Sequence, residues 1–240
     1  MPAERHLDWD GGFNIRDLGG LSTEDGRMVK AGAAVRAGSL HKLTEAGWRS
    51  LEAHGIGTII DLRNANEREA ECYMPPSEKL TAIHLPLEEE NKPEDSEFWK
   101  QWRDFNCSPI YYVPFINQYP ERIATTIRVM ANAKPGGVLF HCGIGRDRTG
   151  LITLILLKLL RATNEEIFQD FALSAERLRP HWEMLGRRND ETNVASLYEK
   201  MGTSAAETIN ATLEAVGQRG QTHAALQDIE LQGLRERFLE

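Results

Sequence analysis

The sequence predicts an α/β fold in which a largely parallel central sheet is flanked by helices. Short apolar runs, such as IGTIIDL at 56–62 and VLFH at 138–141, alternate with longer helical patterns. These runs lack strict polar–apolar alternation, which indicates strands covered on both faces. A chain of 240 residues, 41% of them hydrophobic, is long enough to bury a large core.

The first half of the chain is expected to start with short elements. Residues 11–20 form a short strand and turn, and a second short strand ends at Arg36. Thr44 is the expected N-cap of a helix over 45–53, which Gly55 would stop. The strand at 56–62 follows directly.

The middle of the chain continues the alternation. REAECYMPP at 68–76 is expected to form a short helix ended by proline, and LTAIHLPL at 80–87 a strand. We interpret 88–110, which is acidic and aromatic, as a partly helical surface insertion and a candidate lid. An amphipathic helix is expected within 120–137, with proline near its start and Pro-Gly-Gly at its end.

The last part of the chain is expected to be mainly helical. The pattern predicts a helix over 149–160 and another over 163–174, capped by Thr163 or the residue after it. We predict one domain over 1–178 and a mainly helical C-terminal part over 179–240, packed on that domain or extending from it.

Composition excludes several classes of protein. The net charge of −8 argues against a general nucleic-acid binder, which needs a basic surface. The three cysteines have no paired spacing, so neither a disulfide framework nor a zinc site is expected. The apolar run LITLILLKLL at 151–160 is too short for a membrane span and reads as a buried helix. With no apolar leader at the N-terminus, we expect a cytoplasmic protein without stable membrane insertion.

The stretch HCGIGRDRTG at 141–150 carries the chemistry. It lies between the expected strand and the expected helix, where ligands bind in parallel sheets. A glycine-rich loop that leads into a helix N-terminus can converge its N–H groups on an anion. The expected substrate-binding residues are therefore Gly143, Ile144, Gly145, Arg146, Asp147 and Arg148.

Cys142 and Arg148 are the central pair of this loop. A guanidinium group can hold a tetrahedral oxyanion with two parallel hydrogen bonds. Cysteines at helix N-termini and beside arginines are more readily ionised than free cysteine. Cys142 is therefore expected to be a thiolate nucleophile beside a bound phosphate, with no metal or other cofactor.

Three neighbours of this pair have predicted roles. Asp147 is the nearest proton donor for a leaving group, or else a structural partner of Arg146. Thr149 is expected to donate a hydrogen bond to the cysteine sulfur. His141 is expected to hold the loop by bonding to backbone.

At these residues the chain resembles the cysteine-dependent protein-tyrosine phosphatase superfamily. More narrowly, it resembles the bacterial tyrosine/serine phosphatases with dual- and lipid-specific members, the mycobacterial tyrosine phosphatase B group among them. The resemblance rests on NIRDLGG at 14–20, GTIIDLRNANERE at 57–69, HCGIGRDRTG at 141–150 and FQDFALS at 168–174. It implies a protein-tyrosine-phosphatase-like fold.

The resemblance also implies roles for individual residues. Cys142 would form a phosphocysteine, Arg148 would bind phosphate, and Asp147 would act as general acid from within the loop. Many members carry lysine before that aspartate, and the lysine is associated with phosphoinositide preference. Here Arg146 keeps the positive charge with a different shape and reach.

Other charged residues near the expected sheet edge are supporting candidates. Asp61 could orient a loop arginine, and Arg63 could help to bind substrate, or both could pair with neighbours such as Glu67. Arg16 and Asp17 are expected to brace the fold as a pair.

The function predicted from the sequence is phosphomonoester hydrolysis. The substrate would be a phosphorylated protein, a phosphoinositide or a small phosphate ester. A phosphate-recognition module without turnover is one alternative, although both Cys142 and Arg148 are present. Arsenate reductase is a weaker alternative, because it would place the loop near the N-terminus with further cysteines beside it.

Overall fold

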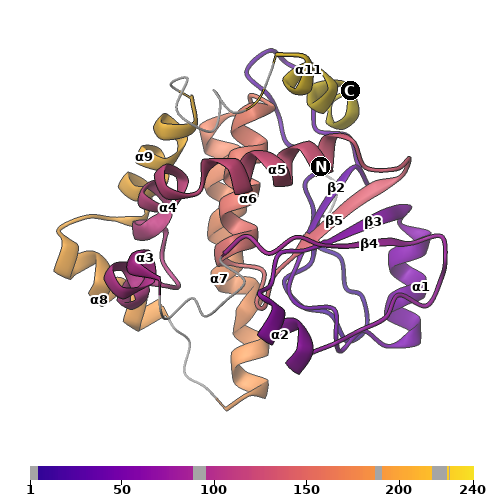
Figure 1. Ribbon diagram of the computed structural model, residues 1–240, viewed down its shortest axis with the longest axis horizontal. Helices are drawn as coiled ribbons and strands as arrows, with labels where there is room; N and C mark the ends of the chain where they lie inside the picture. Colours follow the sequence, from indigo (N-terminus) through magenta and orange to yellow (C-terminus); the bar gives the residue numbers. More distant parts are fainter. Residues whose placement is uncertain (1–4, 89–95, 187–190, 218–225, 227) are drawn as a thin grey trace.

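The computed structural model describes residues 5–88, 96–186, 191–217, 226 and 228–240. A five-stranded sheet lies in the right half of the view in Figure 1, with helices packed against both of its faces. Its strands are β1 (Arg16–Asp17), β2 (Ala34–Ala37), β3 (Ile56–Asp61), β4 (Thr81–His84) and β5 (Gly137–His141). The predicted α/β fold with a largely parallel sheet is confirmed.

The strand order brings the carboxyl ends of four strands to one edge. The order is β1-β2-β5-β3-β4, and only β1 runs antiparallel to its neighbour among these strands. His141 at the end of β5 is in register with Ala37 of β2 and Asp61 of β3. The segment after His141 therefore leaves the sheet at its centre, flanked by strands on both sides.

Successive side chains of the central strands enter two different cores, as the pleat requires. Leu139 and Ile59 lie in a smaller core with Trp48 and Leu51 of α1 (Glu45–Ala53). Phe140 belongs to the larger core on the opposite face. Both faces of the sheet are covered, which explains the lack of alternation in the strand sequences.

Most of the helices pack on the larger core. Buried side chains reach it from α3 (Glu97–Trp102), α4 (Tyr112–Gln118), α5 (Pro120–Ala131), α6 (Asp147–Leu159), α7 (Asn164–Met184), α9 (Ala205–Gly217) and α11 (Asp228–Phe238). The helix α6 runs through the middle of this layer (Figure 1) and is buried almost all round. This explains the uninterrupted apolar run at 151–160.

The C-terminal helices pack on elements from earlier in the chain. The helix α9 contacts α6 and α4, and α11 contacts α5. From the helix α8 (Glu191–Met201), Lys200 places its Nζ 5.8 Å from the centroid of the Phe105 ring. The helix α7 crosses the predicted boundary at residue 178. The division of the chain into parts over 1–178 and 179–240 stays a prediction.

The helix α1 has the predicted ends. Thr44 caps it, because the Thr44 side chain accepts a hydrogen bond from the backbone N–H of Gly47 at 3.2 Å. Gly55 follows the helix with a φ of +85°, a conformation that glycine adopts without strain. Thr163 likewise caps α7, by accepting from the N–H of Glu166.

The predicted helix at 68–76 differs from the observed one. The helix α2 runs over Ala65–Ala70, so it begins earlier than expected and ends before the prolines. Pro75 has no N–H for the carbonyl of Glu71, and that carbonyl instead accepts from Arg63 Nη1 at 3.0 Å. Residues 72–74 are already outside the helix, so the prolines do not end it.

The interpretation of 88–110 as a partly helical insertion agrees with the described residues. They include α3 and short 3-10 helices over Arg103–Phe105 and Pro109–Tyr111. Residues 89–95 lie outside the described part of the chain. Phe98 and Trp99 are buried in the larger core, so this segment is packed on the domain.

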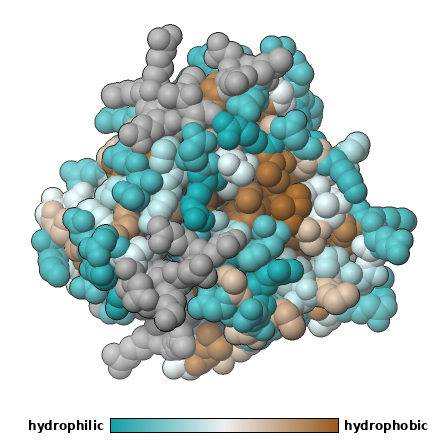
Figure 2. All heavy atoms as spheres, in the orientation of Figure 1, coloured by the Kyte–Doolittle hydropathy of each residue, from teal (hydrophilic) through white to brown (hydrophobic). Residues whose placement is uncertain are grey.

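The face of the molecule in Figure 2 is mainly hydrophilic, with apolar residues gathered near the middle of the view. This matches a chain in which 27% of residues are charged. In the described residues, no helix has both the length and the apolar character needed to cross a membrane.

Candidate functional site

The glycine-rich loop lies where the sequence predicted it. The strand β5 ends at His141, and α6 begins at Asp147. Cys142 is therefore the first residue beyond the central strand, and the loop turns directly into a helix N-terminus. This placement combines the two anion-binding features of the fold, which are the carboxyl edge of the sheet and the helix dipole.

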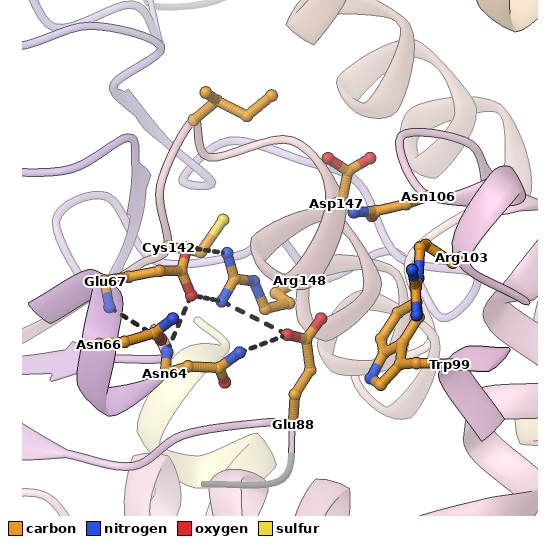
Figure 3. Close-up of a pocket in the computed structure, with 11 residues that line it drawn as sticks. Asn64, Asn66, Glu67, Glu88, Trp99, Arg103, Asn106, Cys142, Asp147 and Arg148 are labelled. Carbon is orange, nitrogen blue, oxygen red and sulfur yellow. Dashed lines mark hydrogen bonds and ion pairs between the residues drawn. The ribbon is translucent and has the colours of Figure 1, made fainter. Parts of the chain in front are cut away.

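A cavity of about 310 Å³ opens at this point (Figure 3). Cys142 is only 2% exposed, so its side chain lies deep in the cavity. The lining residues are Asn64, Asn66, Glu67, Glu88, Trp99, Arg103, Asn106, Cys142, Ile144, Asp147 and Arg148.

The first two carbonyls of the loop point away from the cavity. The carbonyl of Cys142 accepts from Nδ1 of His141 at 3.1 Å, and that of Gly143 accepts from the N–H of Ser39 at 2.8 Å. In a planar trans peptide, the N–H points opposite to the C=O. These bonds therefore orient the next N–H groups along the loop away from the surrounding strands.

The next two carbonyls are held in the same way. The Ile144 carbonyl accepts from Asn14 Nδ2 at 3.0 Å, and the Gly145 carbonyl accepts from Arg36 Nη2 at 2.8 Å. Gly145 has a φ of +70°, and a Cβ there would lie 2.5 Å from the carbonyl oxygen of Ala37. Only glycine fits at that point, as the composition of the loop suggested.

Arg148 reaches the cavity together with two carboxylates. Its Nη1 and Nη2 donate to the two carboxylate oxygens of Glu67 at 2.5 and 2.6 Å. Figure 3 shows the guanidinium between Glu67 and Glu88, whose Oε2 lies 3.7 Å from Nη1. Burial raises the pKa of Glu67, but the Arg148 guanidinium outweighs it and the pKa is lowered. Glu67 is therefore an ionised partner that holds Arg148 in place.

Glu88 is a carboxylate of a different kind. It is buried, and its Oε2 accepts from Asn64 Nδ2 at 2.9 Å. Burial raises its pKa, and the charges of Glu67 and Asp147 add to this effect against that of Arg148. The surroundings of Glu88 thus favour the protonated form of its carboxyl group.

Asp147 and Arg146 point to different cavities. Asp147 lines the Cys142 cavity and accepts from Arg146 Nε at 3.3 Å. Arg146 lines a neighbouring, more apolar cavity of about 300 Å³ with Phe171 and Tyr198. The structure thus shows Asp147 as a partner of Arg146, and its role as proton donor stays a prediction.

These features agree with the comparison to known proteins. The family model described as the tyrosine phosphatase family matches residues 7–240. The chain belongs to the tyrosine phosphatase family.

Two relatives match the chain at low sequence identity. The tyrosine-protein phosphatase of Nostoc commune is 29% identical over 151 residues, which are 62% of this chain and 51% of that protein. The triple specificity protein phosphatase PtpB of Mycobacterium tuberculosis is 23% identical over 191 residues, 68% of this chain and 67% of PtpB. The chain thus matches about half the length of the Nostoc relative.

The imidazole ring of His141 is neutral and supports the loop by bonding to the Cys142 carbonyl. It is fully buried, and its Nε2 lies 2.7 Å from the hydroxyl of Tyr73. Burial lowers the His141 pKa to about 4, although the Asp61 charge opposes this. With Nδ1 donating to the Cys142 carbonyl, Nε2 is the acceptor for Tyr73.

Thr149 is available for the predicted bond to sulfur. Its Oγ1 is buried and has no hydrogen-bond partner among the described residues. The structure therefore leaves the role of this hydroxyl as a prediction.

Asp61 and Arg63 form a buried pair with each other. Arg63 Nη2 donates to Asp61 Oδ2 at 2.8 Å, and Arg63 Nη1 donates to the Ser39 hydroxyl at 3.1 Å. Neither residue is among those that line the cavity. Glu67, which the sequence offered as their partner, pairs with Arg148. Through Ser39, which bonds the Gly143 carbonyl, Arg63 supports the loop from outside.

Arg16 and Asp17 brace the fold, but not as a pair. Arg16 Nε donates to Asp170 at 3.0 Å, whereas Asp17 accepts from the N–H groups of Gly19 and Gly32. The two side chains alternate along β1, so they point to opposite faces of the sheet.

Sequence reasoning missed Glu67 and Glu88 as members of the site. Glu67 had a usable signal, because Asn64 and Glu67 have the spacing of a capping box, and Glu67 Oε2 does accept from the Asn64 N–H at 3.0 Å. No sequence signal distinguishes Glu88, because it is the first of three consecutive glutamates. Trp99, from the acidic and aromatic segment 88–110, also lines the cavity.

Proposed function

We propose that this chain is a protein-tyrosine phosphatase that hydrolyses phosphomonoesters through a phosphocysteine intermediate. The observation that carries the proposal is the position of Cys142 in a cavity that also holds Arg148, beneath a loop whose carbonyls are turned outward. Membership of the tyrosine phosphatase family supports it.

In the first step, the thiolate of Cys142 attacks phosphorus and the bond to the leaving oxygen breaks. Arg148 and the N–H groups of residues 143–148 bind the non-bridging oxygens, over which the charge of the transition state is spread. Asp147 gives its proton to the leaving oxygen, which departs as an alcohol or phenol.

In the second step, water attacks phosphorus and the sulfur–phosphorus bond breaks. The Asp147 carboxylate takes the proton from water, and inorganic phosphate is released. The hydroxyl of Thr149 donates a hydrogen bond to the departing sulfur, which leaves as a thiolate. Neither step needs a metal ion.

Phosphotyrosine is the substrate we propose first. The names of the relatives, a tyrosine-protein phosphatase and a triple specificity phosphatase, support this choice. The indole of Trp99 at the cavity wall gives an apolar surface for a phenyl ring. Phosphoserine, phosphothreonine, phosphoinositides and small esters share the chemistry and form the comparison panel.

The test is hydrolysis of p-nitrophenyl phosphate in the presence of EDTA, for the wild type and Cys142→Ser. We expect metal-independent turnover that falls by about a thousandfold or more in the variant. Cys142→Ser should keep its melting temperature and still bind phosphate, because the loop and Arg148 remain.

Two outcomes would count against the proposal. A folded wild type that binds vanadate but hydrolyses no ester would instead support the phosphate-recognition module. Turnover that persists in Cys142→Ser would exclude the phosphocysteine intermediate.

A further inference from the structure

A cluster of buried charged residues lies behind the phosphate loop, on the side away from the Cys142 cavity. We propose that Asn14 and Arg36, anchored by Asp170, are positioning residues that hold the loop ready for a phosphate group. This inference rests on the proposed function, since it concerns how the same loop is prepared for its ligand.

Asn14 holds one of the two loop peptides that precede a glycine. Its Nδ2 donates to the Ile144 carbonyl at 3.0 Å, and the next residue is Gly145. Glycine allows the peptide before it to rotate at little steric cost. The hydrogen bond to Asn14 therefore keeps the Ile144 carbonyl outward and the Gly145 N–H facing the opposite way.

Arg36 controls the next peptide and connects it to the cluster. Its Nη2 donates to the Gly145 carbonyl at 2.8 Å, while its Nη1 donates to Asp170 Oδ2 at 2.7 Å. Arg36 and Asp170 are both fully buried. The guanidinium is thus a rigid link between α7 and the loop.

Asp170 anchors both positioning residues. Besides Arg36, it accepts from Arg16 Nε at 3.0 Å and from Arg5 Nη1 at 2.9 Å. Arg16 in turn donates from Nη1 to Asn14 Oδ1 at 2.6 Å, which orients the amide so that Nδ2 faces Ile144. One carboxylate on α7 therefore sets the orientation of both contacts to the loop.

The cluster also adds charge behind the loop. Three guanidinium groups surround the single carboxylate of Asp170. Burial and the neighbouring Arg36 lower the Arg16 pKa only to about 10, so Arg16 stays protonated at neutral pH. A net positive charge in a buried position favours both a bound phosphate and a cysteine thiolate.

The decisive variant is Asn14→Gly. Asn14 has a φ of +52°, so glycine removes the side chain without straining the backbone. Arg161→Gly is the matched control, because Arg161 has a φ of +62° and lies on the surface at the far end of α6. Both variants gain the same backbone freedom, but only one loses a contact to the loop.

Two readouts report on the loop itself. We expect Asn14→Gly to bind vanadate about fivefold or more weakly than the wild type, as expected for the loss of one hydrogen bond. We also expect the midpoint of the pH profile for Cys142 alkylation by iodoacetamide to rise. Arg161→Gly should match the wild type in both.

A second variant, Asn14→Asp, is isosteric and keeps the acceptor for Arg16. It replaces the donor to Ile144 with a carboxylate that repels the carbonyl. We expect Asn14→Asp to bind vanadate at least as weakly as Asn14→Gly, although Arg16 keeps its partner. Its folding is checked by melting temperature.

The two proposals fail in different ways. If both Asn14 variants bind vanadate and alkylate like the wild type, even with lower melting temperatures, the cluster is only structural and the positioning role is wrong. If the wild type itself neither hydrolyses esters nor binds vanadate, the proposed phosphatase function fails. Alkylation needs no turnover, so it still decides the positioning role in that case.

Discussion

Asp147 and Glu88 are carboxylic residues of one cavity with different surroundings. Asp147 lies at the start of α6 beside Arg146, whereas Glu88 is buried next to Asn64 and its pKa is raised mainly by burial. A general acid must carry a proton at the working pH and reach the leaving oxygen. Asp147 has the position that the family resemblance implies, while Glu88 has the environment that favours a proton.

A leaving-group comparison separates the two residues. We expect Asp147→Asn to slow hydrolysis of phenyl phosphate by about a hundredfold or more, because phenoxide needs a proton to leave. The loss should be much smaller with p-nitrophenyl phosphate, whose leaving group is stable as an anion. Steady-state kcat for both esters checks this.

Glu88→Gln is the matched control, since it neutralises the other carboxylate of the same cavity. We expect its effect to be the same for both esters. If instead Glu88→Gln shows the larger loss with phenyl phosphate and Asp147→Asn does not, Glu88 is the acid and the assignment of Asp147 is wrong.

At the scale of elements, the short helix α2 is tied to the phosphate loop through Glu67. This carboxylate accepts from the Asn64 N–H at the start of α2 and binds both terminal nitrogens of Arg148. The helix α2 has no buried residue, so this link and the bond from Arg63 to the Glu71 carbonyl hold it on the domain. The position of α2 and that of Arg148 therefore depend on each other.

Glu67→Gln should show this dependence. We expect kcat to fall by about tenfold, because a charge-assisted bond that positions Arg148 is lost. The melting temperature should fall only slightly, since the amide can still accept at the helix start. Kinetics with p-nitrophenyl phosphate and thermal unfolding measure the two effects.

Glu69→Gln provides the control on the same helix, where Glu69 is exposed. It should leave kcat unchanged. A Glu67→Gln variant whose kcat stays within about twofold of wild type would mean that Arg148 is positioned by other contacts.

At the scale of the whole molecule, stability depends on keeping His141 neutral in the core. Its pKa is about 4 in the folded chain because of burial, against a usual value of 6.5. As the pH falls below 6.5, the unfolded chain takes up this proton first. The stability contributed by His141 is thus complete above 6.5 and is lost as the pH falls toward 4.

His141→Asn tests this pH dependence. Asparagine can still donate to the Cys142 carbonyl but does not titrate. Between about pH 7 and about pH 5, the free energy of unfolding should fall by about 2 kcal/mol less in the variant than in the wild type. Denaturant unfolding at the two pH values measures it, and equal losses in both proteins would show that His141 does not control acid stability.

The sequence was sufficient for features set by local chemistry. The strand–loop–helix unit around Cys142, the cap at Thr44 and the buried helix at 151–160 follow from nearest neighbours and apolar patterning. These signals lie within one short stretch of chain, so no knowledge of distant contacts is needed. Membership of the tyrosine phosphatase family was predictable for the same reason, because each of the four segments that carry the resemblance is contiguous.

The tertiary structure alone decided which charges meet. Asp170 forms ion pairs with Arg5, Arg16 and Arg36, which lie more than a hundred residues away in the sequence. Glu67 pairs with Arg148, which is 81 residues away. The sequence does not show which opposite charge a charged side chain will pair with. A buried charged side chain is tolerated only where the fold places an opposite charge beside it. The sequence therefore determined the loop and the place of Cys142 in it, whereas the fold determined the residues that hold them in place.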